Sequence, residues 1–174
     1  MKADTLKEFA GQYNIDPRIL VAILNNESEG RGFDKDGNIK TRFEVGIWSS
    51  FIVQYNEGKK NPILPGLSVE WVRSHTKDEL RLLATSYGIA QIMGWHYPML
   101  NYNSIGDLVS AWTDLEEIQI IDFCIFCVKY RDGKFLKALQ ELDFKAISIM
   151  YNGLGYLRND YDNRLHKNFN VAVL

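Results

Sequence analysis

The spacing of apolar residues along this chain indicates a mainly helical protein. In most segments apolar positions recur three and four residues apart, which is the spacing of one buried helix face. Polar residues typical of helix starts precede several of these segments, such as the capping-box pattern Thr5-x-x-Glu8. The pattern predicts helices over residues 5–13, 16–28, 77–92, 104–112, 114–130, 134–142, 143–151 and 156–169.

The segment between residues 29 and 75 departs from this helical pattern. Asp36-Gly37 is a tight-turn signal, and residues 39–45 alternate in the way of a half-buried strand. The remainder, through the Pro-Gly pair at Pro65-Gly66, is typical of a loop. We therefore predict a mainly α (α+β) domain in which a hairpin and long loop, roughly residues 30–75, form one wall of a cleft.

A carboxylate ends the apolar stripe of the helix predicted over residues 16–28. Asp16-Pro17 is a helix-start pair, Leu20 and Leu24 lie one turn apart, and Glu27 follows three residues later. A carboxyl group held against apolar neighbours resists ionisation, so its pKa rises. A general acid needs this state near neutral pH. The alternative is an ordinary surface glutamate at a helix end.

A second carboxylate, Glu44, lies on the predicted strand and shares its polar face with Lys40 and Arg42. A surface salt bridge with these cations is one interpretation. The other is a carboxylate that lines the cleft opposite Glu27 and is kept ionised by its cationic neighbours.

Composition and charge narrow the function classes. The chain has 174 residues, 46% hydrophobic and 24% charged, which fits one globular domain over residues 1–174. A formal net charge of -2 provides no basic surface for nucleic acid, and no apolar run is long enough to span a membrane. The N-terminal segment lacks the apolar core of a signal peptide. We expect a monomer made in the cytoplasm, with no nucleic-acid partner and no membrane insertion.

No cofactor or metal is predicted. Cys124 and Cys127 lie in the middle of an apolar helix, where buried thiols are favoured over a redox pair or a zinc site. The three histidines are scattered without ligand spacing. The stretch from Asp34 to Asn38 departs from a calcium loop, because its glycine is fourth rather than sixth.

Two clusters combine glycines with polar side chains. Gly88 allows close backbone approach, and Gln91, one turn later, is able to point an amide at a ligand. Tyr151 and Asn152 end a predicted helix directly before Gly153. Each cluster alone is an ordinary helix end, so the argument depends on their occurring together with the glutamate that ends the helix over 16–28.

In that combination the chain resembles the lysozyme-like superfamily, which includes goose-type lysozymes and soluble lytic transglycosylases. It is more similar to the N-acetylmuramidase family of phage endolysins and related bacterial proteins. The matching pieces occur in order over about the whole chain: Glu27-Ser28, Gly30-Arg-Gly-Phe33, Asp36-Gly37, Phe43-Glu44, Ser86-Tyr-Gly-Ile-Ala-Gln-Ile-Met-Gly94 and Tyr151-Asn-Gly153. Two positions differ from the family's pattern: Glu29 replaces a small or neutral residue and Ala90 an aromatic one. No separate cell-wall-binding domain is expected.

The resemblance implies a peptidoglycan hydrolase that cuts the β-1,4 bond between N-acetylmuramic acid and N-acetylglucosamine. Glu27 would be the general acid and Glu44 the second carboxylate; inverting and retaining geometries are both open, and goose-type resemblance favours inversion. Tyr151 would hydrogen-bond Glu27 and orient it. The implied substrate-binding residues are Ser86, Tyr87, Gln91, Trp95, Tyr151 and Asn152, and Tyr97 is a further aromatic platform if these rings are not core.

Two other functions stay open. A lytic transglycosylase would use Glu27 as acid and then base, leaving an anhydro sugar, but its second motif would follow the glutamate more closely. A non-catalytic glycan-binding protein on the same scaffold would not need Glu27, Glu44, Gln91 and Tyr151 together. An endolysin-type enzyme would reach the bacterial cell wall in the periplasm through a holin or an equivalent route.

Overall fold

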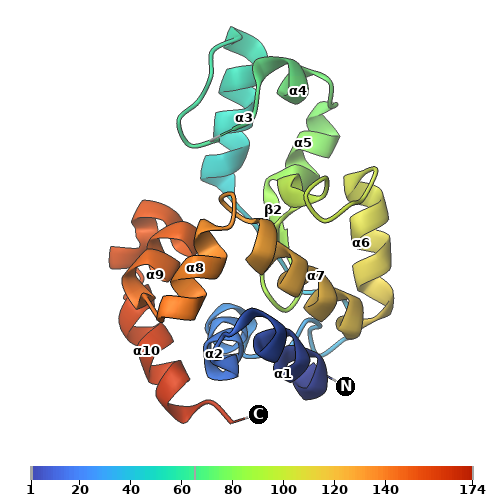
Figure 1. Ribbon diagram of the computed structural model, residues 1–174. Helices are drawn as coiled ribbons and strands as arrows, with labels where there is room; N and C mark the ends of the chain where they lie inside the picture. Colours follow the sequence, from blue (N-terminus) through green and yellow to red (C-terminus); the bar gives the residue numbers. More distant parts are fainter. Residues whose placement is uncertain (1, 65, 174) are drawn as a thin grey trace.

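The computed structural model describes residues 2–64 and 66–173, and most of this part of the chain is helical (Figure 1). Its α-helices are α1 (Lys2–Tyr13), α2 (Pro17–Ser28), α3 (Val45–Glu57), α4 (Val69–Arg73), α5 (Lys77–Leu83), α6 (Ile105–Asp114), α7 (Glu116–Lys129), α8 (Lys134–Glu141), α9 (Phe144–Asn152) and α10 (Tyr161–Val171). Short 3-10 helices are η1 (Gly94–His96) and η2 (Gly153–Leu157). The strands β1 (Thr41–Phe43), β2 (Thr85–Tyr87) and β3 (Ile92–Met93) form one antiparallel sheet in that order. The predicted mainly helical fold with a small β part is confirmed.

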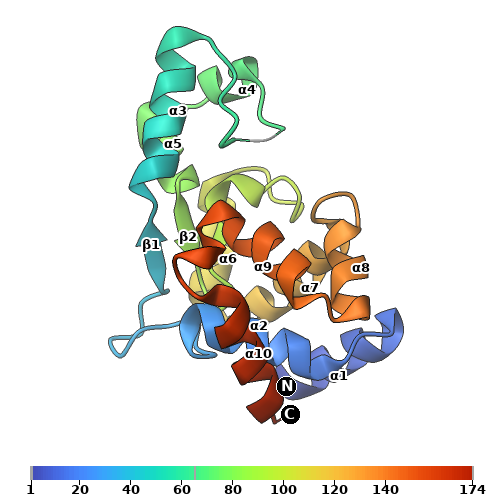
Figure 2. The same ribbon diagram turned by 90° about the vertical axis from the view of Figure 1, so that its left-hand side faces the viewer.

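The helices form two groups that meet at the small sheet. α3, α4 and α5 stand together at the top of Figure 1, and α1, α2 and α7 to α10 lie below them. Figure 2 shows β1 rising from the level of α2 to the start of α3. The sheet therefore connects the end of α2 with the upper group of helices.

α2 packs at the centre of the lower group. Seven of its twelve residues are buried, and Ile19, Leu20, Ile23 and Leu24 among them form one apolar side of the helix. α10 runs along α2 and contributes the buried Leu165 to the shared core. A helix buried over this much of its surface holds its last turn, which carries Glu27, in a fixed place.

Several helices begin where the sequence predicts. Asp16 accepts a hydrogen bond of 3.0 Å from the backbone N of Arg18, and Pro17 occupies the first turn of α2. Ser104 and Asp143 cap α6 and α9 through their side chains in the same way. Local side-chain chemistry thus determines these starts.

Both ends of the chain differ in detail from the prediction. α1 already begins at Lys2, so Thr5 lies inside the helix and not at its N-cap. The helix predicted over 156–169 is divided into η2 and α10, because Asp160 adopts a left-handed backbone with φ of 49°. Neither difference moves a candidate site residue to another element.

The prediction of one helix over residues 77–92 is wrong. α5 ends at Leu83, and the chain continues as β2, a turn and β3. The turn contains Gly88 with φ of 72° and Gln91 with φ of 47°, values that a right-handed helix does not allow. The apolar spacing of this segment reflects burial in a hairpin.

The predictions for residues 39–66 are correct only in part. The strand covers Thr41–Phe43 alone and pairs with β2, whereas the expected hairpin flanks share a single bridge between Phe33 and Ile39. Val45 begins α3, so most of the predicted loop is helix. The burial of Phe51 and Gln54 against neighbouring elements stabilises α3 despite its serines and glycine. Pro65, in the predicted loop, lies outside the described residues.

Candidate active site

Glu27 lies in the last turn of α2, partly buried, and receives a hydrogen bond from a residue far along the chain. The hydroxyl of Tyr161, at the start of α10, donates to its Oε1 at 2.5 Å. Tyr161 is 4% exposed, so this bond is shielded from solvent. The bond fixes one oxygen of the carboxyl group and leaves the other free to carry a proton.

Burial raises the pKa of the Glu27 carboxyl from its usual value of 4.5 to about 7. The bond from Tyr161 and the charges of Arg42 and Arg164 act in the opposite direction, and the charge of Glu44 adds to the rise. A carboxyl group with this pKa is protonated in a large fraction of molecules near neutral pH. The sequence-based expectation that Glu27 has a raised pKa agrees with this environment.

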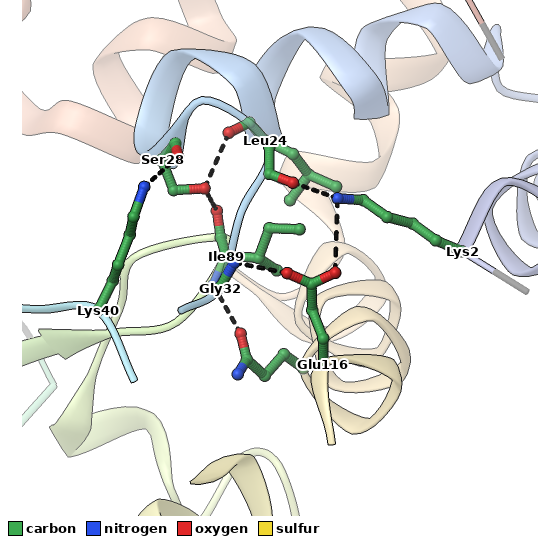
Figure 3. Close-up of polar contacts among 9 residues, drawn as sticks. Lys2, Leu24, Ser28, Gly32, Lys40, Ile89 and Glu116 are labelled. Carbon is green, nitrogen blue, oxygen red and sulfur yellow. Dashed lines mark hydrogen bonds and ion pairs between the residues drawn. The ribbon is translucent and has the colours of Figure 1, made fainter. Parts of the chain in front are cut away.

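The end of α2 is fastened to the β2–β3 turn by the residue after the glutamate (Figure 3). Ser28 Oγ donates to the carbonyl oxygens of Ile89 at 2.6 Å and Leu24 at 3.2 Å. Lys40 Nζ donates to the carbonyl of Ser28 at 2.6 Å. Lys40 therefore supports α2 and does not join the charge pair of Glu44.

The glycine-rich segment after α2 is held by side chains from α1 and α7, which Figure 3 also shows. Glu116 Oε1 accepts a hydrogen bond of 2.6 Å from the backbone N of Gly32, and Lys2 Nζ lies 3.8 Å from the other carboxylate oxygen of Glu116. Lys2 also donates to the carbonyl of Gly30. A Cβ at Gly32 would lie only 2.2 Å from Oε1 of Gln119, so the close approach excludes larger residues.

Glu44 follows β1 and occupies the N-cap position of α3, with no side-chain capping bond. Its Oε1 accepts a 2.5 Å bond from Nε of Arg42, and its side chain is 32% exposed. The predicted pairing with Arg42 is therefore present.

Three adjoining cavities connect these residues into one cleft. The first, the Glu27 cavity, has a volume of about 600 Å³ and is lined by Glu27, Arg42 and Gln91 among others. The second, the Glu44 cavity, has about 360 Å³ and shares Arg42 and Gln91 with the first. The third, the Trp71 cavity, has about 620 Å³ and shares Trp95 with the second. Glu27 and Glu44 thus line neighbouring parts of the cleft, with Arg42 and Gln91 at the boundary.

The predicted ligand-facing amide of Gln91 is already engaged within the protein. Its Oε1 accepts a bond of 2.9 Å from Ser86 Oγ, and its Nε2 donates to the carbonyl of Gly88 at 2.9 Å. Ser86 is 2% exposed, so it is placed to hold Gln91 and not to touch a glycan. Gln91 still lines both the Glu27 cavity and the Glu44 cavity.

The expected bond from Tyr151 to Glu27 is absent. The hydroxyl of Tyr151 donates instead to the carbonyl of Ala90 at 2.5 Å, and its ring stacks on Tyr161 with centroids 6.4 Å apart. Tyr161 makes the bond to Glu27, and sequence reasoning missed it. Its position one turn before Leu165 resembles an ordinary core face, so the sequence offered no motif for it.

The three aromatic residues expected to stack on sugars differ in whether they reach the cleft. Tyr87 is buried and donates to the carbonyl of Leu82, so it is core and not a platform. Trp95 lines the Glu44 and Trp71 cavities, and its Nε1 donates to Nε2 of His96 at 2.9 Å. Tyr97 contacts Trp71 with ring centroids 6.5 Å apart.

Asn152, the last residue of α9, lines the Glu44 cavity. Its buried Nδ2 has no hydrogen-bond partner in the described part of the chain. A donor in this state is costly to bury without a partner.

The remaining candidates lie outside the cleft. Cys124 and Cys127 are buried, and burial raises the pKa of Cys124 to about 12 and holds that of Cys127 well above its usual value. Oδ1 of Asp34 accepts bonds from the backbone N of Asp36 and of Asn38, both at 2.9 Å, as in a closed turn. Among the described residues no helix is long and apolar enough to cross a membrane.

The fold and the cleft define a lysozyme-like glycoside hydrolase, with a protonatable glutamate at a helix end and a second carboxylate nearby. The chain belongs to the N-acetylmuramidase family, whose model matches residues 16–172. It is therefore a glycoside hydrolase that acts on peptidoglycan.

A solved structure gives the same result for the fold. The crystal structure of the Burkholderia AP3 phage endolysin is similar to this chain at a TM-score of 0.67 and 27% sequence identity. The similarity covers 97% of this chain and 70% of that one. No curated protein sequence matches the chain. The resemblance drawn from the sequence motifs is confirmed.

Proposed function

We propose that this chain is an endolysin-type N-acetylmuramidase that hydrolyses the β-1,4 bond between N-acetylmuramic acid and N-acetylglucosamine. The observation that carries the proposal is the carboxyl group of Glu27, whose pKa burial raises to about 7 while Tyr161 holds its Oε1. Family membership and likeness to a phage endolysin support the substrate and the setting.

Glu27 is the general acid. Tyr161 occupies Oε1, so Oε2 carries the proton that is delivered to the leaving glycosidic oxygen. Protonation of that oxygen removes the need to expel an alkoxide, while positive charge develops on the sugar ring.

Glu44 is the base that activates water from the other side of the bond. It lines the cavity next to that of Glu27, and Arg42 at their boundary pairs with it at 2.5 Å. Placement in separate adjoining cavities favours the wider spacing of inverting enzymes, which leaves room for a water molecule.

Three side chains of the Glu44 cavity are suited to hold the glycan. The amide of Asn152, which lines this cavity, is suited to hydrogen-bond a sugar hydroxyl or N-acetyl group, and the ring of Trp95 offers an apolar surface for a sugar face. Gln91, held by Ser86, shapes the boundary between the two cavities.

A reaction on peptidoglycan places the enzyme at the bacterial cell wall. The enzyme would be a monomer that acts on the bacterial cell wall after release from the cytoplasm through a membrane pore made by another protein. The likeness to a phage endolysin supports this arrangement.

Mass spectrometry of peptidoglycan digested in oxygen-18 water tests the proposal. Hydrolysis at muramic acid places the label at a muramic acid reducing end. Predominantly anhydro ends would assign a transglycosylase instead, and label on glucosamine would mean that the other glycosidic bond is cut. Peptidoglycan that remains uncut would indicate a non-catalytic glycan-binding protein.

A further inference from the structure

The Trp71 cavity lies beyond the catalytic part of the cleft and has a different lining. It is continuous with the Glu44 cavity because both are lined by Trp95, His96, Tyr130 and Arg131. Its volume of about 620 Å³ is within the range of small-ligand sites. A glycan bound across Glu44 therefore passes the mouth of this cavity.

The wall of the cavity is largely apolar and held in place. Trp71 contacts His75 with ring centroids 4.3 Å apart, and Pro98 and Met99 line the same space. Trp95 is oriented by its bond to His96, which burial keeps neutral by lowering its pKa to about 3. These surfaces suit alkyl groups better than the hydroxyls of a bare sugar.

Arg131 supplies a cation at the junction of the two cavities. Its guanidinium lies over the ring of Tyr130, 5.4 Å from the centroid, and is exposed. Within the described residues it makes no side-chain hydrogen bond and no ion pair, although Asp132 lines the same cavity. A guanidinium presented in this way is suited to bind a carboxylate through two parallel hydrogen bonds.

We propose that the Trp71 cavity binds the acidic stem peptide attached to muramic acid, with Arg131 pairing with a peptide carboxylate. This inference rests on the proposed function, since the peptide is carried by the same glycan that Glu27 and Glu44 cut. Such peptides combine alkyl side chains, carboxylates and an amine, which match the apolar wall, Arg131 and Asp132 respectively. Peptide-bearing strands are then bound more tightly than bare glycan.

The test compares two soluble substrates: uncrosslinked glycan strands with their peptides, and the same strands after an amidase has removed them. Arg131→Gln keeps a polar side chain but removes the charge, and Arg131→Lys keeps the charge without the bidentate geometry. Arg158→Gln is the matched control, because Arg158 is an exposed arginine that lines none of the three cavities. Circular dichroism melting confirms that each variant is folded.

We expect Arg131→Gln to raise KM about 3–10-fold on peptide-bearing strands, with kcat unchanged, and to raise KM on bare strands by less, since Arg131 also lines the Glu44 cavity. Arg131→Lys should fall between the wild type and Arg131→Gln, and Arg158→Gln should match the wild type. Equal changes of KM on both substrates, or none, would overturn the peptide site and leave the muramidase assignment standing. Absence of cleavage of either substrate by the wild type would overturn both.

Discussion

The hydroxyl of Tyr161 donates a 2.5 Å hydrogen bond to Oε1 of Glu27, although the two residues lie 134 positions apart in the chain. Packing of α10 along α2 makes this contact, because it places the first residue of α10 beside the last turn of α2. The bond favours the ionised carboxyl, so it restrains a pKa that burial raises. Tyr161 thus orients the Glu27 carboxyl group and limits the rise of its pKa.

Replacement of Tyr161 by Phe removes the hydroxyl and keeps the ring. The pKa of Glu27 should rise further above about 7, because a bond that favours the charged form is lost. The alkaline limb of the pH–rate profile should therefore move to higher pH, while kcat at the optimum falls about tenfold through loss of orientation.

Tyr151→Phe is the matched control for that profile. Its hydroxyl belongs to the same ring stack but donates to the carbonyl of Ala90. The position of its alkaline limb should equal that of the wild type. A limb that stays in place in Tyr161→Phe would contradict the role given to this bond.

Replacement of Glu27 by Gln preserves shape and removes the acid proton. The lytic rate should fall by about 10²–10⁴-fold, the usual contribution of a positioned proton donor. The measurement is turbidity loss of cells stripped of their outer membrane, with circular dichroism to confirm folding. A folded variant with near-normal activity would show that Glu27 is not the general acid.

The same substitution should change how stability depends on pH. The folded-state pKa of Glu27, about 7, lies above its usual value of 4.5, so its contribution to stability is fully present below 4.5 and is lost as pH rises through about 7. Glu27→Gln does not suffer this loss. The free energy of unfolding of Glu27→Gln, measured relative to that of the wild type, should therefore be about 2–3 kcal/mol higher at pH 8 than at pH 5. Urea unfolding at both pH values measures the gain, and an unchanged difference would refute it.

The sequence singled out Glu27 as the proposed acid because the signal for it is local. Asp16, Pro17 and the apolar stripe determine α2, and Glu27 follows from spacing along one helix. Tyr161 depends on which helices pack together, and that information is not contained in the spacing of residues within α10. Its pattern with Leu165 predicts only a buried face.

The hairpin of β2 and β3 escaped prediction for a related reason. Its apolar spacing is compatible with a helix, but the chain turns at Gly88, where Gln119 from α7 approaches the backbone. Gln119 Oε1 accepts a 2.8 Å bond from the backbone N of Ile89, and its Nε2 donates to the carbonyl of Trp112. Long-range hydrogen bonds of this kind override local helix spacing.

Replacement of Glu44 by Gln tests the second carboxylate. As a general base Glu44 should be worth about 10²-fold or more in kcat, with substrate binding retained. Glu29→Gln is a matched control, since Glu29 also pairs with an arginine two positions away, Arg31, at the same 2.5 Å as Glu44 with Arg42. Its rate should stay within about twofold of the wild type, because exposed pairs contribute little. A loss under about tenfold for Glu44→Gln, or equal losses for both variants, would remove Glu44 from the mechanism.

Gly88→Ala tests the contact between Gln119 and the turn that holds the acid. Gly88 has φ of 72°, and an added Cβ would lie 2.6 Å from Oε1 of Gln119, so the bond to Ile89 must be displaced. Gly37→Ala is the control, because Gly37 has φ of 82° with no heavy atom within 4 Å of the added Cβ. Backbone strain alone should reduce the free energy of unfolding by about 1–2 kcal/mol in Gly37→Ala, and the lost hydrogen bond should bring the loss in Gly88→Ala to about 2–4 kcal/mol. Only Gly88→Ala should also reduce turnover, since Ile89 accepts the bond from Ser28 that fastens the end of α2. Equal losses of stability, with turnover unchanged in both variants, would show that Gln119 does not support the acid.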